Sequence, residues 1–261
     1  MTALQRLHSQ RSQGEVLLRV ERHGLARMRE VGAAKVRFPH GGRDAILINT
    51  GGGLAGGDQF RYSIAAGEEA QLTVTAQAAE RVYRTLGPAA SVKTTLSAAK
   101  NAQLMWLPNE TIFYDGAALT RELHADVASS AILLAVETDV FGRTAMGEVV
   151  RSISLKERWR IRRDGRLVFA DDFVIEGALP SSSATLGDAR AMAIVVLVAE
   201  DAESRLDSVR AAIANRDGAS AWNGKLVARL LARDGFELRK ALVPALAALV
   251  GEASLPKVWS M

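Results

Sequence analysis

The chain of 261 residues contains no cysteine. This absence excludes disulfides, thiolate metal sites, cysteine nucleophiles and iron–sulfur ligation. The sequence also has no run of about 18 uncharged apolar residues, the length that a transmembrane helix needs. Residues 1–14 show no apolar segment of the kind found in secretory signals, so we expect a cytoplasmic protein.

Aromatic residues are scarce, at 5%, and only four histidines are present. No two histidines stand at metal-ligand spacing, so we expect each to be a surface or turn residue: His8, His23, His40 and His124. Nucleophile elbows (G-x-S-x-G) and H-E-x-x-H sites are also absent. The sequence therefore offers no convincing catalytic constellation and favours a binding or assembly protein. A β-fold hydrolase that uses clustered carboxylates stays open as the alternative.

The charge is unevenly distributed along the chain. The net charge of +4 divides into +6 over residues 1–43, −6 over 44–204 and +4 over 205–261. A nucleic-acid binder usually concentrates its cations on one face together with stacking aromatics, which are few here. Complementary charged surfaces that meet protein partners explain the asymmetry at least as well.

Alternation of apolar and polar residues predicts a mainly β fold up to about residue 200. The strands are short and closely spaced, which leaves no room for crossover helices and disfavours a doubly wound fold. A sandwich, a barrel or a stacked, β-helix-like arrangement remains, although no fixed-period repeat supports a regular solenoid. Asp164-Gly165 predicts a hairpin turn. The expected strands cover 16–21, 45–48, 60–64, 72–76, 91–97, 102–107, 110–114, 118–127, 131–139, 149–162, 166–176 and 192–199.

The pattern changes after residue 200, where apolar residues fall at helical spacing. Three helical stripes are expected: Leu206, Val209 and Ile213; Leu226, Leu230 and Leu231; and Phe236, Leu242, Val243, Leu246, Leu249 and Val250. Pro244 predicts a kink or restart in the third stripe, and residues 177–190 read as a loop. The apolar tail 255–261 is expected to dock on the body or on a partner, and docking on the body is favoured. We expect a single domain over 1–261, with a β-rich body over about 15–200 and a helical section over about 203–251 packed on it.

A glycine-rich run from Asn49 to Asp58 is the most conspicuous motif. Seven of the 22 glycines lie between residues 41 and 57. The run satisfies G-x-G-x-x-G, but strand alternation follows it where a dinucleotide site requires a helix. No Gly-Lys-Ser/Thr closes a phosphate loop. Two interpretations remain: a tight turn in which Asp58 bonds the turn amides, or a binding surface where a partner or an ion approaches bare backbone.

Two further motifs carry carboxylates. Residues 106–116 contain Glu110 in a predicted packed corner, and residues 137–148 bring three carboxylates together with Arg143. An internal arginine–carboxylate pair that fixes a turn explains the second motif. A carboxylate-lined path for a cation explains it equally well.

The ordered set of motifs resembles the urease accessory protein UreD family, called UreH in some organisms. The resemblance covers nearly the whole chain. It departs from the family pattern at Asn109, where Gln is frequent, and at Lys257, where Arg is frequent. It rests on Asn49–Asp58, Val82–Arg84, Trp106–Phe113, Gly142–Glu148, Arg229–Leu231 and Pro256–Trp259. We expect the structural or partner-contacting residues of these motifs to be Gly51, Gly52, Gly53, Gly56, Gly57, Tyr83, Trp106 and Arg143.

The resemblance implies a mainly β protein, a helix-like stack of strands with two helices. It also implies a non-enzymatic chaperone that forms a complex with UreF and UreG and docks on apo-urease. Such a protein assists delivery of Ni²⁺ to the dinuclear site of urease. Neither a tightly bound cofactor nor a tight metal site is expected, only transient Ni²⁺.

A conduit for Ni²⁺ must bind weakly, because a tight site would trap the ion, and scattered carboxylates suit this requirement. The candidates for such a path are the acids inside the family motifs: Asp58, Glu110, Glu137 and Glu148. Helices at the C-terminus are expected to expose an apolar partner interface that consists of Leu226, Leu230, Leu242, Leu246 and Leu249.

Overall fold

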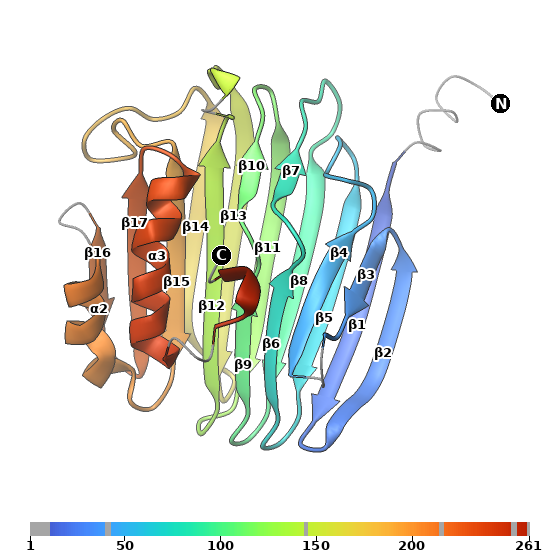
Figure 1. Cartoon of the computed structure of the whole chain (residues 1–261), viewed down its shortest axis with the longest axis vertical. Coiled ribbons are helices and arrows are strands. Elements are labelled where there is room, and N and C mark those ends of the chain that lie inside the picture. The colour runs from blue at the N-terminus through green and yellow to red at the C-terminus, as the bar shows by residue number, and fades with distance from the viewer. Residues whose placement is uncertain (1–10, 40–42, 144–145, 214–216, 252–254, 260–261) are drawn as a thin grey trace.

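Two β-sheets lie face to face and a pair of helices covers one of them (Figure 1). The computed structural model describes residues 11–39, 43–143, 146–213, 217–251 and 255–259. His8 and His40 lie outside the described residues. No described helix is long and apolar enough to cross a membrane.

The first sheet has seven strands in the order β14-β13-β11-β8-β5-β1-β2. Neighbouring strands from β1 to β13 run parallel, and antiparallel β2 and β14 form the two edges. The bounds are β1 (Gln13–Glu21), β2 (Gly24–Gly32), β5 (Gln59–Ala66), β8 (Ala90–Ala98), β11 (Ala118–Val127), β13 (Ile153–Arg163) and β14 (Arg166–Gly177).

The second sheet follows the order β16-β17-β15-β12-β9-β6-β4-β3, and β10 pairs with both β12 and β7. Its central strands β4, β6, β9 and β12 are parallel. The bounds are β3 (Ala34–Arg37), β4 (Asp44–Asn49), β6 (Gln71–Ala76), β7 (Glu80–Val82), β9 (Gln103–Leu107), β10 (Thr111–Phe113), β12 (Ile132–Phe141), β15 (Ala191–Val198), β16 (Gly218–Ala221) and β17 (Lys225–Ala232).

The central body passes back and forth between the two sheets, so the chain coils as a stack. The coils begin with β4, β6, β9 and β12, at residues 44, 71, 103 and 132, and each returns through a strand of the first sheet. This unequal spacing explains why the sequence shows no fixed-period repeat although the fold is a stack. The prediction of a mainly β, stacked fold is confirmed.

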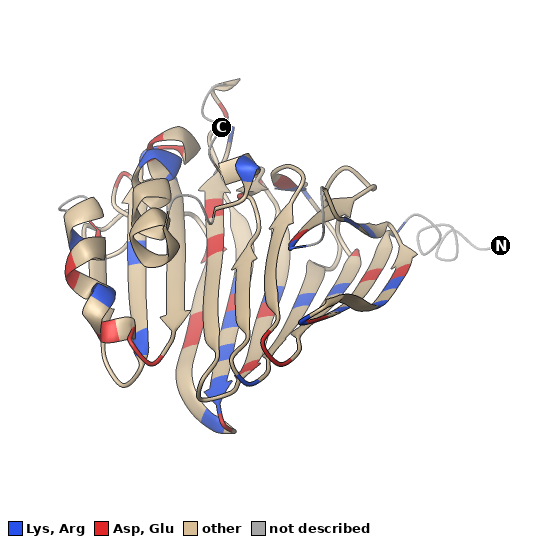
Figure 2. Cartoon of the chain, turned by 60° about the horizontal axis from the view of Figure 1, so that its bottom comes forward, with Lys and Arg blue, Asp and Glu red and all other residues tan. Residues whose placement is uncertain are grey.

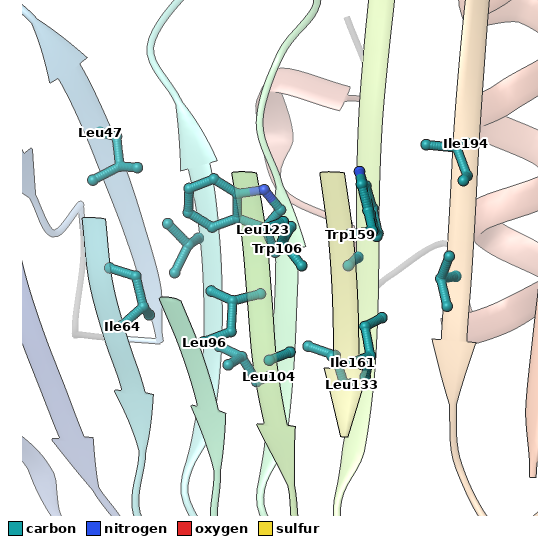
Figure 3. Close-up of a cluster of buried hydrophobic side chains, with 14 of the residues drawn as sticks. Leu47, Ile64, Leu96, Leu104, Trp106, Leu123, Leu133, Trp159, Ile161 and Ile194 are labelled. Carbon is teal, nitrogen blue, oxygen red and sulfur yellow. The ribbon is translucent and has the colours of Figure 1, made fainter. Parts of the chain in front are cut away.

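Inward-facing side chains of neighbouring coils form ladders between the sheets. In the first sheet Ile64 lies beside Leu96, and in the second Leu104 lies beside Leu133. These side chains are buried and point into the shared core (Figure 3). Full burial of each is worth about 1.5–3 kcal/mol, so the ladder dominates the stability of the stack.

A second apolar layer lies on the outer face of the second sheet, beneath the helices. The helical elements are η2 (Ala202–Arg205), α2 (Leu206–Ala212), α3 (Gly235–Val250) and η4 (Lys257–Trp259). Asp234 caps α3 by accepting a hydrogen bond from the Glu237 amide at 2.8 Å. In the tail, buried Trp259 donates from its indole nitrogen to the Leu107 carbonyl at 3.1 Å, as expected for self-docking.

Most expected elements are present, including the Asp164-Gly165 hairpin, the 177–190 loop and the helices over 206–212 and 235–250. Five strands of the structure were not expected, namely β2, β3, β7, β16 and β17. The helical prediction for Leu226, Leu230 and Leu231 is wrong, because these residues lie on β17. This strand is covered on both faces, so it lacks the alternation that identifies a strand. The helix does not restart at Pro244, because α3 runs through this residue as one element.

The expected apolar partner interface is not exposed. Its five leucines are at most 2% exposed: Leu226, Leu230, Leu242, Leu246 and Leu249. They form the layer that joins the second sheet to α3. These leucines therefore offer no surface to a partner.

Charges of both signs are interspersed along the strands of the first sheet (Figure 2). Lys93 pairs with Glu122 at 3.3 Å across β8 and β11, and Arg158 pairs with Asp172 at 2.9 Å across β13 and β14. This mixture of signs differs from the single-sign face that nucleic-acid binding requires.

Candidate functional site

One arginine, Arg121, lies between the two sheets among three carboxylates. Arg121 and Glu157 come from paired positions on β11 and β13, whereas Glu137 and Asp139 come from β12 of the opposite sheet. All four side chains are between 2 and 6% exposed. We call Arg121, Glu137, Asp139 and Glu157 the buried acid cluster.

The guanidinium of Arg121 contacts every acid of the cluster. Its Nε donates to Glu157 Oε1 at 2.5 Å, and its Nη2 donates to Asp139 Oδ1 at 2.6 Å. Its Nη1 lies 2.9 Å from Glu137 Oε2 and donates to Thr111 Oγ1 at 2.9 Å. The remaining oxygen of Glu137 accepts a hydrogen bond from the Trp106 indole at 3.0 Å. The planar guanidinium of arginine carries several N–H donors and can bond three acids at once. The single ammonium group of lysine does not offer this geometry.

Burial changes the protonation of the cluster. Burial alone would lower the pKa of Arg121, but the charges of Asp139, Glu137 and Glu157 raise it well above its ordinary value. Burial also raises the pKa values of Glu137 and Asp139 against the opposing effect of Arg121. The same competition raises the pKa of Glu157 to about 8. Arg121 therefore remains charged while its acids resist ionisation.

A cavity of about 190 Å³ leads from the surface to this cluster, and Arg121 and Glu137 form part of its lining. Tyr62 and Trp106, with ring centroids 6.1 Å apart, also line it. Its exposed lining residues mark the opening: Gly52, Gln77, Ala78 and Arg81. A second cavity of about 30 Å³ is lined by Glu157, Asp171 and Arg229. The buried acid cluster thus contributes residues to both cavities.

Glu80 lines the larger cavity close to its opening. Its carboxylate accepts hydrogen bonds from Asn49 Nδ2 at 3.1 and 3.2 Å. Burial raises the pKa of Glu80, and the Asn49 hydrogen bonds oppose that rise. Together with Glu137, Glu80 gives this cavity acidic side chains at two positions.

The four acids predicted for a path do not lie together. Glu137 is a member of the buried acid cluster. Asp58 is buried in the glycine-rich turn, where it accepts from the amides of Ser12 and Ala55 at 2.7 and 2.8 Å. Glu148 accepts from Arg143 Nε at 2.8 Å. The Glu110 carboxylate lies 3.8 Å from the guanidinium of Arg239 on α3.

Sequence reasoning did not identify Arg121 and Glu157. The sequence does contain a sign of both, because each residue stands at a position of an alternating strand where its neighbours are apolar. Arg121 lies between Leu119 and Leu123, and Glu157 lies between Leu155 and Trp159. A charge in the buried phase of a strand needs a partner. Among the described residues, no three histidine, cysteine, aspartate or glutamate side chains are arranged to hold a metal ion.

The remaining motif residues meet at one end of the stack. Tyr83 donates to the Gly52 carbonyl at 2.8 Å and packs edge-on against Tyr114. Arg143 lies over the Tyr114 ring at 4.2 Å. Gly53 cannot carry a side chain, for two reasons. Its φ is +142°, and a Cβ atom at this position would lie 2.4 Å from the Tyr83 ring. Close packing therefore explains the glycine at this position.

Neighbouring glycines of the run serve the same packing. A Cβ at Gly56 would collide with Thr85, and one at Gly57 would collide with Arg11. Gly51 and Gly52 lie exposed at the surface of the turn. The strand β5 follows the run directly, which confirms that it is not a dinucleotide-binding loop.

Comparison with known proteins assigns the family. Residues 12–260 match the family described as UreD urease accessory protein. The chain belongs to the UreD family. It is 44% identical over 248 residues to the urease accessory protein UreD of Mesorhizobium japonicum, covering 91% of this chain and 88% of that protein. It is 43% identical over 250 residues to urease accessory protein UreD 1 of Brucella melitensis biotype 1, covering 92% and 89%. The match to the UreD family therefore covers the β stack, the helices and most of the C-terminal tail.

The acid cluster of this UreD chain makes its stability depend on pH. The ordinary pKa of Glu157 is 4.5, and the folded value is about 8. Between these values the folded state retains a proton that the unfolded state releases, so the free energy of unfolding falls as the pH rises from about 5 to 8. The contribution of Glu157 is complete below pH 4.5 and lost above pH 8. Urea denaturation at intervals across this range measures the slope.

The variant Glu157→Gln should have a shallower slope than the wild type, because Gln does not titrate. Some slope should remain, since burial also raises the pKa values of Glu137 and Asp139. Glu122→Gln on the outer face of β11 is the matched control and should keep the wild-type slope. A wild-type stability that increases with pH across this range, or an unchanged slope in Glu157→Gln, would contradict the assignment.

Proposed function

We propose that this protein is a non-catalytic urease maturation factor that forms a complex with UreF and UreG and docks on apo-urease. In that complex it passes Ni²⁺ toward the dinuclear site of urease by way of the buried acid cluster. Membership of a family of urease accessory proteins supports the maturation role. The observation that carries the nickel role is the position of the buried acid cluster, with residues in both cavities.

The charges of the cluster suit transient passage of a divalent cation. Three acids surround one guanidinium, so an arriving cation that displaces the protons held by burial meets an excess of up to two negative charges. A divalent cation in a low-dielectric interior needs such compensation. Arg121 already bonds all three acids, which gives them a partner when no ion is present. Competition between Arg121 and the ion keeps binding weak, as a relay requires.

The cavities define a route for this passage. The larger cavity brings Ni²⁺ from the surface past Glu80 to Glu137, and the smaller one lies on the side of Glu157 and Asp171. Of the four acids suggested by sequence, Glu137 alone belongs to this route. Asp58 and Glu148 bond backbone amides and Arg143, so we assign them to turn stability instead.

Co-expression with tagged UreF and UreG of the same organism tests the maturation role. A stoichiometric complex should appear in pull-down and size-exclusion experiments, and it should activate apo-urease when Ni²⁺ and GTP are supplied. A folded chain that binds neither partner and leaves apo-urease inactive would contradict the proposal. Activation without this chain, under the same conditions, would contradict it as well.

A further inference from the structure

Three loops meet at one end of the stack, and two of them carry exposed apolar side chains. The loops follow β7, β10 and β12 and lie at the upper end in Figure 1. Leu86, Met146 and Val149 are 96, 75 and 71% exposed. Isolated exposed apolar residues are common, but three such residues on adjoining loops are a feature of interaction surfaces.

Internal bonds join the described parts of these loops to one another. The amide of Asp115 donates to Glu148 Oε1 at 3.2 Å, and Asp115 Oδ1 accepts from the Arg151 amide at 2.7 Å. The amide of Thr85 donates to the Gly116 carbonyl at 3.0 Å. The stacking of Tyr83, Tyr114 and Arg143 adds side-chain contacts to this frame. The surface is therefore preorganised, which lowers the cost of binding.

The charge of this surface is positive. Segments 81–89, 114–117 and 142–152 contain four arginines and two carboxylates. Both carboxylates, Asp115 and Glu148, are occupied within the frame. Arg81, Arg84 and Arg151 are exposed, and among the described residues none of them forms an ion pair. These three exposed cations come from the same loops and strand ends as the apolar side chains and are available to an acidic partner.

We propose that this end, comprising Leu86, Met146, Val149, Arg81, Arg84 and Arg151, is the docking surface for a partner protein that presents acidic residues around an apolar centre. We call it the loop-end surface. The inference rests on the proposed function for the nature of the partner. Its position has a consequence, because Gly52 and Arg81 also line the opening of the larger cavity. A partner seated on the loop-end surface would stand next to the point where the cavity meets solvent.

Binding measurements with UreF and with apo-urease test this proposal. Each partner is added to the full chain, and biolayer interferometry follows binding at several salt concentrations. Leu86→Asp and Val149→Asp should each weaken the binding of one of these partners by about tenfold or more. Arg84→Glu with Arg151→Glu should slow association and flatten its salt dependence, because interfacial charges act mainly on the association rate. Circular dichroism should show unchanged folding, since all four side chains are exposed.

Matched controls lie away from these loops. Leu167 and Val174 on β14 are 48 and 56% exposed, and Leu167→Asp and Val174→Asp should leave the binding of both partners unchanged. Equal binding by the loop-end and control variants would overturn the proposal, as would loss in the control variants alone. Self-association of the wild-type chain that Leu86→Asp abolishes would assign the surface to a second copy and also overturn it. If the wild type binds neither protein, the proposed function fails, which is a separate result.

Discussion

Replacement of Arg121 by leucine should abolish stable folding at neutral pH. The substitution leaves Glu137, Asp139 and Glu157 facing one another in the core without a cation. Breaking a buried ion pair by removal of one partner costs about 3–5 kcal/mol, a large fraction of the stability of a typical domain. Arg121 serves three acids, so the upper part of that range is expected. Urea denaturation of the purified chain, or the soluble yield where none can be purified, measures the effect.

A surface ion pair provides the control for this experiment. Arg158 pairs with Asp172 at 2.9 Å between β13 and β14, but both side chains are about half exposed. Arg158→Leu should cost less than about 1 kcal/mol. The triple variant Arg121→Leu with Glu137→Gln and Glu157→Gln should recover part of the loss, because it removes the repulsion together with the cation. An Arg121→Leu protein as stable as Arg158→Leu would show that the cluster does not depend on its arginine.

The fold was predictable from the sequence where strands have one buried and one exposed face. β11 and β13 alternate over their whole length, and Asp164-Gly165 marks the turn that follows β13. β17 was not predictable in this way, because Leu226 faces the helices while Val227 faces the other sheet. Burial of both faces removes the period of two on which strand prediction depends.

The candidate site was predictable only in part. Glu137 was identified because it lies in a motif rich in carboxylates. Arg121 and Glu157 are 36 positions apart, and only the stacking of coils brings them together. A periodic pattern shows that each residue is buried, but it does not show which strands become neighbours. The structure also explains the scattered motifs, since the residues around Gly52, Tyr83 and Arg143 meet at one end of the stack.

Replacement of Glu137 by glutamine should strongly reduce nickel delivery while the maturation complex still assembles. The introduced amide would keep an acceptor for the Trp106 indole, whose bond to Glu137 measures 3.0 Å, but the negative charge at the end of the larger cavity would be lost. At an effective dielectric constant of about 20, two unit charges about 4 Å apart interact by about 4 kcal/mol. Loss of even a third of this value slows passage about tenfold.

The control for Glu137→Gln is Glu122→Gln, which changes the same residue type on the outer face of β11, next to Arg121 in the sequence. Both variants should form the complex with UreF and UreG in wild-type amounts. Only Glu137→Gln should deliver nickel slowly, and a higher Ni²⁺ concentration should compensate in part, because the rest of the route is intact.

The nickel content of urease matured by each variant complex tests the central claim most directly. Urease is purified after a fixed activation time at limiting Ni²⁺, and its metal content is measured by inductively coupled plasma mass spectrometry. Passage through the buried acid cluster predicts about one tenth of the wild-type nickel with Glu137→Gln and the full amount with Glu122→Gln. Equal nickel in urease from both variants, with equal amounts of assembled complex, would contradict a role for the cluster in nickel transfer.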